Sequence, residues 1–285
     1  MLWALRVGWL ALPVTVGIAL AHALDGTSTP VAAVAAALAW LAWGLVVVAI
    51  LVPRTVSLTA LRVGAPAALA VAVTASIRSG VDGAALVALA WSAAVTALVL
   101  FVPVITDAFV DGSSYGPERR MALRVPAPLL LAPAPLTWAA TVAGVTVGPL
   151  LLAAKAWVLG AIVTAVGFAV AWLGVGALHR LSRRWVVFTP AGLVLHDTMI
   201  AGDVFLFPKA MVRGLGPATV DTSATDVTGR ALGLVLELQL TEANKVRGTE
   251  TDRLLISPVR PGALLQEARA RGLATSPPPT TSSPS

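Results

Sequence analysis

Long apolar runs alternate with short polar segments through the first 179 residues, and the pattern changes after that point. A helix needs about 20 apolar residues to cross a hydrocarbon core that is roughly 30 Å thick. Each run is expected to be helical, because an open strand in lipid would leave backbone groups unpaired. Six runs are long enough, and they predict membrane spans at about 3–23, 31–52, 58–77, 84–105, 127–147 and 156–178.

Two short motifs alternate along these runs. Ala-Leu-Arg-Val occurs at 4–7, 60–63 and 122–125, each time where an apolar run begins. A second motif, Ala-x-Ala-Trp, occurs at 37–40, 88–91 and 154–157, in or just before the run that follows. Self-similarity of this kind indicates a repeat architecture. We therefore expect a polytopic helical domain over 1–179, built from three helical hairpins like the parallel repeats of some transporters.

The composition supports a membrane protein with a soluble appendage. The chain of 285 residues is 57% hydrophobic and 12% charged, whereas soluble domains carry about 25% charged residues. Its lack of cysteine excludes disulfides, thiolate catalysis and Cys-ligated metals. The net charge of +6 is not gathered in one patch, so no nucleic-acid partner is expected. The many Ala, Val, Leu, Gly, Pro and Arg residues are typical of a high-GC bacterium, which suggests a bacterial cytoplasmic membrane.

Basic residues near the predicted span ends set the expected orientation, since Lys and Arg gather on the cytoplasmic side. Nine arginines fall on one side and only Arg78 and Lys155 on the other. The nine are Arg6, Arg54, Arg62, Arg119, Arg120, Arg124, Arg180, Arg183 and Arg184. Both termini and the 106–126 loop are therefore predicted to be cytoplasmic. An alternative for the first run is a signal peptide, because Ala21-His22-Ala23 has the small residues of a cleavage site.

The three motif arginines, Arg6, Arg62 and Arg124, have two interpretations. They could anchor the helices by reaching the headgroups, or form a cationic ring that holds an anionic headgroup or solute. No Asp or Glu lies well inside a predicted span. Ion-coupled transporters usually need such groups there, so a proton-coupled pump is not favoured.

The 106–126 loop is the most polar part of the predicted membrane domain. Its candidate functional residues are Asp107, Asp111, Tyr115, Glu118, Arg119 and Arg120. Asp107 and Asp111 would share a helix face and could hold Mg²⁺ with a phosphate. Asp111-Gly112 matches only the start of the CDP-alcohol phosphotransferase signature. The other interpretations are a solvated hinge and a docking surface for the C-terminal domain.

Residues 180–272 predict a small β-rich cytoplasmic domain. The expected strands are 185–189, 193–197, 204–207, 211–215, 231–240 and 253–257, and a helix is expected from 261 to about 271. Long loops are expected at 216–230 and 241–251. Residues 273–285 form a Pro/Ser/Thr tail that is expected to be disordered.

Two phrases of this domain carry a family resemblance. RWVVFTPAGLVLHD, at 184–197, and SPVRPGALL, at 257–265, resemble uncharacterised actinobacterial multi-pass membrane proteins with a C-terminal bacterial PH-like domain. The resemblance covers about 180–272 and implies a PH-like fold without a catalytic motif. The first hairpin loop, Thr189–Gly192, lacks the basic residues with which PH domains bind phosphoinositides.

The expected partners are the lipid bilayer and, through residues 180–272, another protein. Arg180, Arg183 and Arg184 follow the last predicted span and are expected to attract anionic headgroups. His196-Asp197 is expected to be a structural pair at a strand end, since no nucleophile motif accompanies it. No catalytic, metal-binding or cofactor-binding residue is predicted.

Three functions remain open from the sequence. The first is a non-enzymatic membrane scaffold, in cell-envelope processes, whose PH-like domain binds a partner. The second is a lipid or anionic-solute transporter built on the three hairpins. The third is a Mg²⁺-dependent enzyme that acts on lipid phosphates through Asp107 and Asp111.

Overall fold

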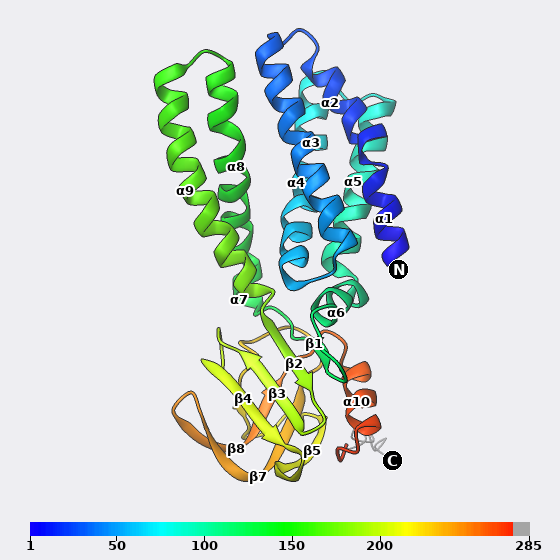
Figure 1. Ribbon diagram of the computed structural model, residues 1–285, viewed down its shortest axis with the longest axis vertical. Coiled ribbons are helices and arrows are strands. Elements are labelled where there is room, and N and C mark those ends of the chain that lie inside the picture. The colour runs from blue at the N-terminus through cyan, green and yellow to red at the C-terminus, as the bar shows by residue number, and fades with distance from the viewer. Residues whose placement is uncertain (276–285) are drawn as a thin grey trace, which may run out of the picture. The chain divides into compact units, whose positions relative to one another are not determined.

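The computed structural model describes residues 1–275 and divides the chain into two compact units (Figure 1). The helical unit contains Met1–Phe109 and Ala134–His179. The β unit contains Val110–Pro133 and the chain from Arg180 onward. The sequence predicts that residues 110–133 belong to the membrane domain. This prediction is wrong, because these residues belong to the β unit. The tail was predicted to be disordered, and residues 276–285 of it lie outside the described residues.

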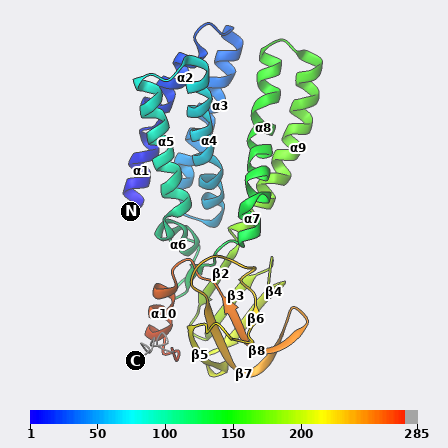
Figure 2. The ribbon, with the colours of Figure 1, turned by 180° about the vertical axis from the view of Figure 1, so that it is seen from behind.

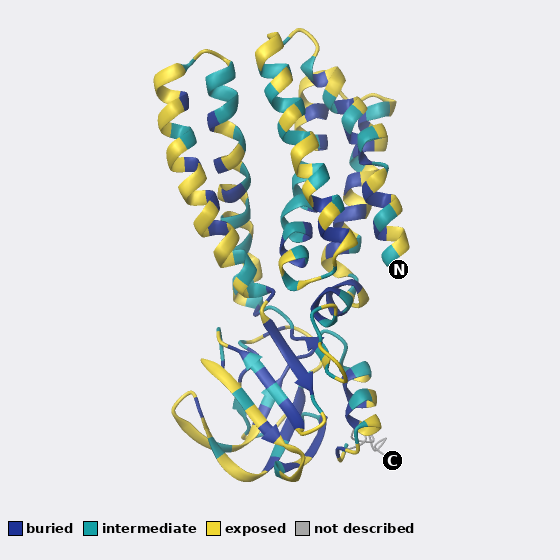
Figure 3. Cartoon of the chain, in the orientation of Figure 1, coloured by how far each residue is buried: buried dark blue, intermediate teal, exposed yellow. Residues whose placement is uncertain are grey.

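Within residues 1–275, five helices are long and apolar enough to cross a membrane: α3 (Thr29–Leu51), α4 (Thr55–Ser79), α5 (Gly83–Phe101), α8 (Pro133–Ala153) and α9 (Trp157–Leu181). Exposed residues recur along these helices (Figure 3). Many of them are large and apolar, such as Trp172 on α9, which is 82% exposed. Apolar surface on this scale suits lipid rather than water. The chain is therefore a multi-pass membrane protein with a helical membrane part and a β part.

The first predicted span is not one continuous helix. It consists of α1 (Leu2–Leu10), the 3₁₀ turn η1 (Leu12–Val14) and α2 (Val16–Leu24). Pro13 lies in this turn, where it cannot donate a backbone hydrogen bond and its ring clashes with the preceding turn. Thr15 Oγ1 donates to the Ala11 and Leu12 carbonyls, at 3.1 and 3.3 Å, which satisfies acceptors at the break.

The fifth predicted span is also interrupted. Its start forms α7 (Ala127–Leu131), which is separated by Ala132 from α8. Ala132 precedes Pro133, and the proline ring disfavours helical backbone at the residue before it. Its φ of −141° departs from the helix accordingly. Pro66 and Pro149, in contrast, lie inside unbroken helices.

Tryptophan side chains join the helices of the helical unit. Trp9 and Trp43 each donate their indole N–H to the other's carbonyl oxygen, both at 3.1 Å. Trp91 donates to Gly8 at 2.8 Å, and Trp138 donates to Val63 at 3.0 Å. A buried indole N–H needs an acceptor, and in lipid the carbonyl of a neighbouring helix can supply it. These bonds fasten α1 to α3 and α5, and α8 to α4.

The β unit contains two four-stranded sheets (Figures 1 and 2). The first has the order β1 (Arg119–Ala122), β2 (Arg184–Phe188), β3 (Gly192–Asp197), β4 (Asp203–Pro208), and all its pairs are antiparallel. The second has the order β5 (Val212–Pro217), β7 (Leu236–Val246), β8 (Thr249–Ile256), β6 (Thr225–Asp226), with only β6 parallel to its neighbour. A short 3₁₀ turn, η2 (Lys209–Met211), links the sheets.

Four features of this unit differ from the prediction. Strand β6 lies within the expected 216–230 loop. Strand β1 lies in the 106–126 loop, where no strand was expected. Strand β7 begins at Leu236 rather than at 231. Most of the expected 241–251 loop is a hairpin of β7 and β8, which turns at Arg247 and Gly248 with positive φ values of 54° and 82°.

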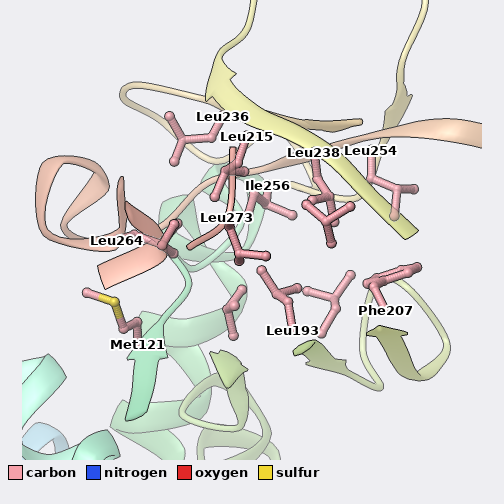
Figure 4. Packing of buried hydrophobic residues seen from close by; sticks show 14 of the residues in the cluster. Met121, Leu193, Phe207, Leu215, Leu236, Leu238, Leu254, Ile256, Leu264 and Leu273 are labelled. Atoms are coloured by element: carbon pink, nitrogen blue, oxygen red, sulfur yellow. The ribbon is translucent and has the colours of Figure 1, made fainter. Parts of the chain in front are cut away.

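One apolar core lies between the two sheets and α10 (Pro261–Ala270). Leu193 and Phe207 of the first sheet and Leu236 and Leu254 of the second are fully buried in it (Figure 4). Met121 of β1 joins them and is 3% exposed. Helix α10 contributes the face that the sequence predicts, Leu264, Leu265 and Ala268. Because β1 supplies core residues, residues 119–122 are an integral part of this fold.

Candidate functional site

The 106–126 loop does not form a metal site. Asp111 accepts hydrogen bonds from the Arg120 backbone N–H and the Ser114 hydroxyl, both at 3.0 Å, and pairs with Arg119 at 3.2 Å. These contacts give Asp111 a structural role at the start of β1. Within residues 1–275 no group of three or more His, Asp or Glu side chains could hold a metal ion. Tyr115 is 85% exposed, as a solvated loop would have it.

The three motif arginines lie in different surroundings. The Arg6 guanidinium is 5.3 Å from the centre of the Trp3 ring. Arg62, on α4, donates to the Thr106 hydroxyl at 3.2 Å. Arg124 belongs to the β unit, where it donates to the carbonyls of Pro258 at 3.2 Å and Val259 at 3.4 Å. The expected ring of three equivalent helix-start arginines is therefore wrong for Arg124, because residues 119–122 form a strand instead of leading into a helix.

The three arginines that follow the last predicted span also lie in different surroundings. Arg180 and Arg183 are exposed, as lipid contact requires. Arg184 is 2% exposed and donates to Asp197 Oδ2 from Nε at 2.9 Å and from Nη2 at 2.6 Å. It also donates to the Arg124 and Val227 carbonyls, at 2.6 and 3.1 Å. The prediction that Arg184 contacts lipid is thus wrong, because its donors are used inside the β unit.

His196 and Asp197 have the structural role that the sequence analysis expected. Asp197 Oδ1 accepts the backbone N–H groups of Met199 and Ile200, at 3.2 and 3.0 Å, and thereby caps the turn after β3. The His196 ring lies 3.2 Å from the Arg183 carbonyl through Nδ1. Neither residue contacts a candidate nucleophile in these interactions.

A hollow on the outer face of the first sheet is the best candidate for a binding site. It has a volume of about 320 Å³ and is lined by Glu118, Arg120, Trp185, Val187, Thr189, Val194 and His196. The strand register explains this grouping. Arg120 lies opposite Val187, which lies opposite Val194, and Trp185 lies opposite His196. Cross-strand partners share a sheet face, so the two rows form one continuous surface, which we call the sheet groove.

The sheet groove combines aromatic, apolar and charged groups. The Trp185 and His196 rings stack with centroids 4.4 Å apart and planes at 14°. The Arg120 guanidinium lies 5.8 Å from the centre of the Trp185 ring and pairs with Glu118 at 3.5 Å. Arg120 Nε is buried and has no hydrogen-bond partner within the described chain. Trp185 and Val187 are only 7% and 8% exposed, so the groove can hold an apolar group mainly against Val194 and an acceptor at Arg120.

Sequence reasoning identified only part of this groove. Glu118 and Arg120 were candidates because they lie in the polar loop, but Trp185, Val187, Val194 and His196 were not. The period of two along 185–187 and 194–196 places these residues on one face of a strand pair. That signal identifies a sheet face, but the contribution of Arg120 requires knowledge of β1.

A second polar group lies in the helical unit. Thr59 Oγ1 is 2.9 Å from His179 Nδ1, which joins α4 to the end of α9. Arg62, one turn after Thr59, bonds to Thr106 on α6 (Pro103–Asp111). Thr59, Thr106 and Asp107 are each at most 5% exposed. Asp107 was predicted to lie in a solvated loop with Asp111, whereas it is buried in the helical unit.

Comparison of the chain with models of protein families, with curated proteins and with solved structures finds no match.

Proposed function

We propose that this protein is a non-enzymatic membrane scaffold whose β unit binds a partner protein at the sheet groove. The observation that carries the proposal is the open hollow lined by Arg120, Trp185, Val194 and His196. Its walls lack a nucleophile paired with a base, whereas aromatic and arginine side chains are the usual anchors of protein interfaces. The distribution of Arg and Lys supports a cytoplasmic location for the β unit, in a bacterial cell membrane.

The element order of the β unit supports a PH-like fold. One sheet is antiparallel, the other is antiparallel apart from β6, and a C-terminal helix packs on the core. Several strands closed by one C-terminal helix are also what the resemblance of residues 184–197 and 257–265 to bacterial PH-like domains implies. Domains built on such sheets commonly act by binding rather than by catalysis, which agrees with a scaffold in cell-envelope processes.

The groove also indicates what the partner must offer. A buried donor without an acceptor costs about 1–3 kcal/mol, and Arg120 Nε is such a donor. A partner whose carboxylate or carbonyl oxygen reaches Nε would remove that cost. An apolar side chain beside it would cover Val194, which is more exposed than Trp185 and Val187. We therefore propose a protein segment that carries an apolar residue next to an acidic one.

The test compares two substitutions in the full chain, purified from native membranes in mild detergent. Val194→Glu places a charge in the groove, whereas Val220→Glu changes a side chain that is 100% exposed outside it. We expect a stoichiometric partner to co-purify with the wild type and Val220→Glu but not with Val194→Glu. Recovery of the chain alone from all three would reject the scaffold. Deletion from residue 180 onward is unsuitable, because it would leave β1 without its partner strand.

A second candidate function is transport of an anionic solute or lipid, and one observation favours it. Arg62 is an ionisable side chain within a membrane-length helix, and it bonds to Thr106. Such residues often line a substrate path. If the protein transports, Arg62→Gln should abolish uptake in proteoliposomes while Arg6→Gln, in the short helix α1, retains it. Equal uptake by the two variants would count against an Arg62 site. The lipid-phosphate enzyme has no comparable support, since Asp111 is used by β1.

A further inference from the structure

The loop between β6 and β7, residues 227–235, exposes two leucines on an otherwise fixed backbone. Leu232 is 72% exposed and Leu234 is 52% exposed. Val227, Thr228 and Ala231 are buried beneath them, at 8% exposure or less. We call residues 227–235 the leucine loop. The two exposed leucines of this loop therefore belong to a segment whose neighbouring residues are buried.

Backbone geometry holds this loop in place. Gly229, Arg230 and Gly233 all have positive φ, at 65°, 60° and 109°. Arg230 is a rare residue type for that conformation. Thr228 N–H donates to Asp226 Oδ1 at 2.7 Å, and Arg230 N–H donates to the Thr228 hydroxyl at 3.1 Å. These local bonds fix the turn that presents Leu232 and Leu234.

The leucine loop packs on the segment of the β unit that leads to the membrane helices. A methyl group on Gly233 would come within 2.7 Å of the Arg124 guanidinium carbon, and one on Gly229 within 2.9 Å of the Pro126 ring. Arg184, just after α9, donates to the Val227 carbonyl. Helix α7 begins directly after Pro126 and carries Leu131, which is 84% exposed. The loop thus lies at the end of the β unit from which the chain enters α8.

The charges at this end match a bilayer surface. Arg230, in the loop, is exposed, and so are Arg180 and Arg183, which come just before Arg184 in the chain. Asp226 is also exposed, but its Oδ1 is used by Thr228. Leucines that reach past the headgroups, with arginines beside them, are the usual combination in segments that bind the membrane interface.

We propose that the leucine loop inserts Leu232 and Leu234 into the interfacial region of the bilayer to which α8 and α9 belong. The loop then gives the β unit an attachment besides its three covalent connections to the helical unit. The partner is lipid rather than protein, because the loop packs on Arg124 and Pro126, and the membrane-length helix α8 begins at Pro133, seven residues after Pro126. This inference does not depend on the sheet groove, whose residues lie on β1, β2 and β3 and in the connections beside them.

The native chain has no cysteine, so single cysteines can be labelled without a background. Leu232→Cys and Leu234→Cys are compared with Leu206→Cys, on β4, which has a similar exposed fraction of 56%. Each full-length variant carries an environment-sensitive dye and is placed in lipid nanodiscs with or without lipids that bear a nitroxide near the top of the acyl chain. Apart from the scaffold protein at its rim, the nanodisc contains no protein that could cover the loop.

We expect the labels at 232 and 234 to be blue-shifted and quenched by the nitroxide lipid about twofold or more, since interfacial insertion reaches about 5–10 Å into the boundary. The label at 206 should stay solvent-like and unquenched. If the labels at 232 and 234 behave like the one at 206, the proposal is wrong. A dye that drew the loop into the membrane by itself would do the same at 206, and that outcome would also overturn the proposal.

Discussion

At the scale of single residues, the Arg184–Asp197 ion pair is the feature whose energetics are clearest. The side chains of Arg184 and Asp197 are 1% and 0% exposed. Removing water from two charges is costly, and their attraction offsets that cost only when the remaining donors and acceptors are also bonded. Here Arg184 reaches two carbonyls and Asp197 caps a turn. Losing one partner of this pair should therefore destabilise the β unit much more than losing both partners.

We predict that Asp197→Asn destabilises the β unit by about 3–5 kcal/mol, because it leaves the Arg184 charge buried and unmatched. Asn preserves an oxygen for Ile200, but its amide nitrogen replaces the acceptor of Arg184 Nε and Nη2, so the loss combines the charge with these two hydrogen bonds. Thermal unfolding of the full chain in detergent, followed by tryptophan fluorescence, measures it. Arg183→Gln, at the exposed neighbouring position, is the control. The double variant Arg184→Met/Asp197→Leu should recover much of the loss, and an Asp197→Asn protein as stable as the control would contradict the prediction.

At the scale of elements, α8 and α9 pack through glycines. A methyl group on Gly144 would collide with the Gly167 carbonyl oxygen, and one on Gly167 with the carbonyl oxygen of Gly144. Gly148 faces Thr164 and Gly174 faces Thr141 in the same way. Small residues allow helix backbones to approach closely in lipid, where packing replaces the hydrophobic effect between helices. The two helices therefore form a tight hairpin.

Gly167→Leu should disrupt this hairpin, because the side chain has no space against α8. Overpacking typically costs about 1–3 kcal/mol, occasionally more, and we expect the melting temperature of the detergent-solubilised chain to fall by several degrees. Gly176→Leu is the matched control, since Gly176 lies on the same helix and has open space around it. Equal melting temperatures for the two variants would show that the close approach is not needed.

Strand β1 is an element that the sequence does not predict. The long apolar helices, the β2–β3 hairpin and the apolar face of α10 could be predicted, since each follows from local periodicity. Strand β1 has four residues, lies in a polar loop and pairs with β2, which comes after two membrane helices. No local pattern encodes such a pairing. Arg120 enters the sheet groove through β1, so the groove was missed for the same reason.

If β1 is part of the β core, Met121→Asp should unfold the β unit although it lies in what resembles a linker. Met121 is 3% exposed, and an unpaired buried carboxylate costs several kcal/mol. Limited proteolysis of the full chain should then cut within 184–256 at a protease concentration that spares the wild type. Tyr115→Asp, in the exposed part of the same loop, should remain resistant. Resistance of both variants would place β1 outside the core.

At the scale of the whole molecule, the chain order interweaves the two units. Helices α8 and α9 are inserted between β1 and β2, which are neighbours in one sheet. The sheet therefore cannot be completed until this helical hairpin has been made. The expected boundary at residue 180 treated the β domain as an appendage, because composition changes there. Composition reports the environment of a segment and not its tertiary partners, which is why residues 110–133 were assigned to the wrong unit.

The number of times that the chain crosses the membrane is also a property of the whole molecule. Helices α1 and α2 are too short to span singly, but together with η1 they cover about 33 Å at roughly 1.5 Å per α-helical residue and 2.0 Å per 3₁₀ residue. The segment runs alongside α5, and the two views agree on this (Figures 1 and 2). Arg78, at the end of α4, donates to the Ala23 carbonyl at 3.1 Å, whereas Trp91 reaches Gly8 further along. We predict that the broken segment crosses the membrane as a sixth span.

Single-cysteine labelling of intact cells with an impermeant reagent tests this. Three membrane-length helices, α3, α4 and α5, lie between residue 28 and the β unit. Ser28→Cys should therefore lie outside and be labelled, and Tyr115→Cys should be protected until the cells are opened. Leu2→Cys decides the question. Protection like that of Tyr115→Cys means that the broken segment crosses, because the N-terminus then shares the side of the β unit. Labelling like that of Ser28→Cys means that α1 and α2 return to the outer surface, and the six-span prediction is then wrong in its first span alone.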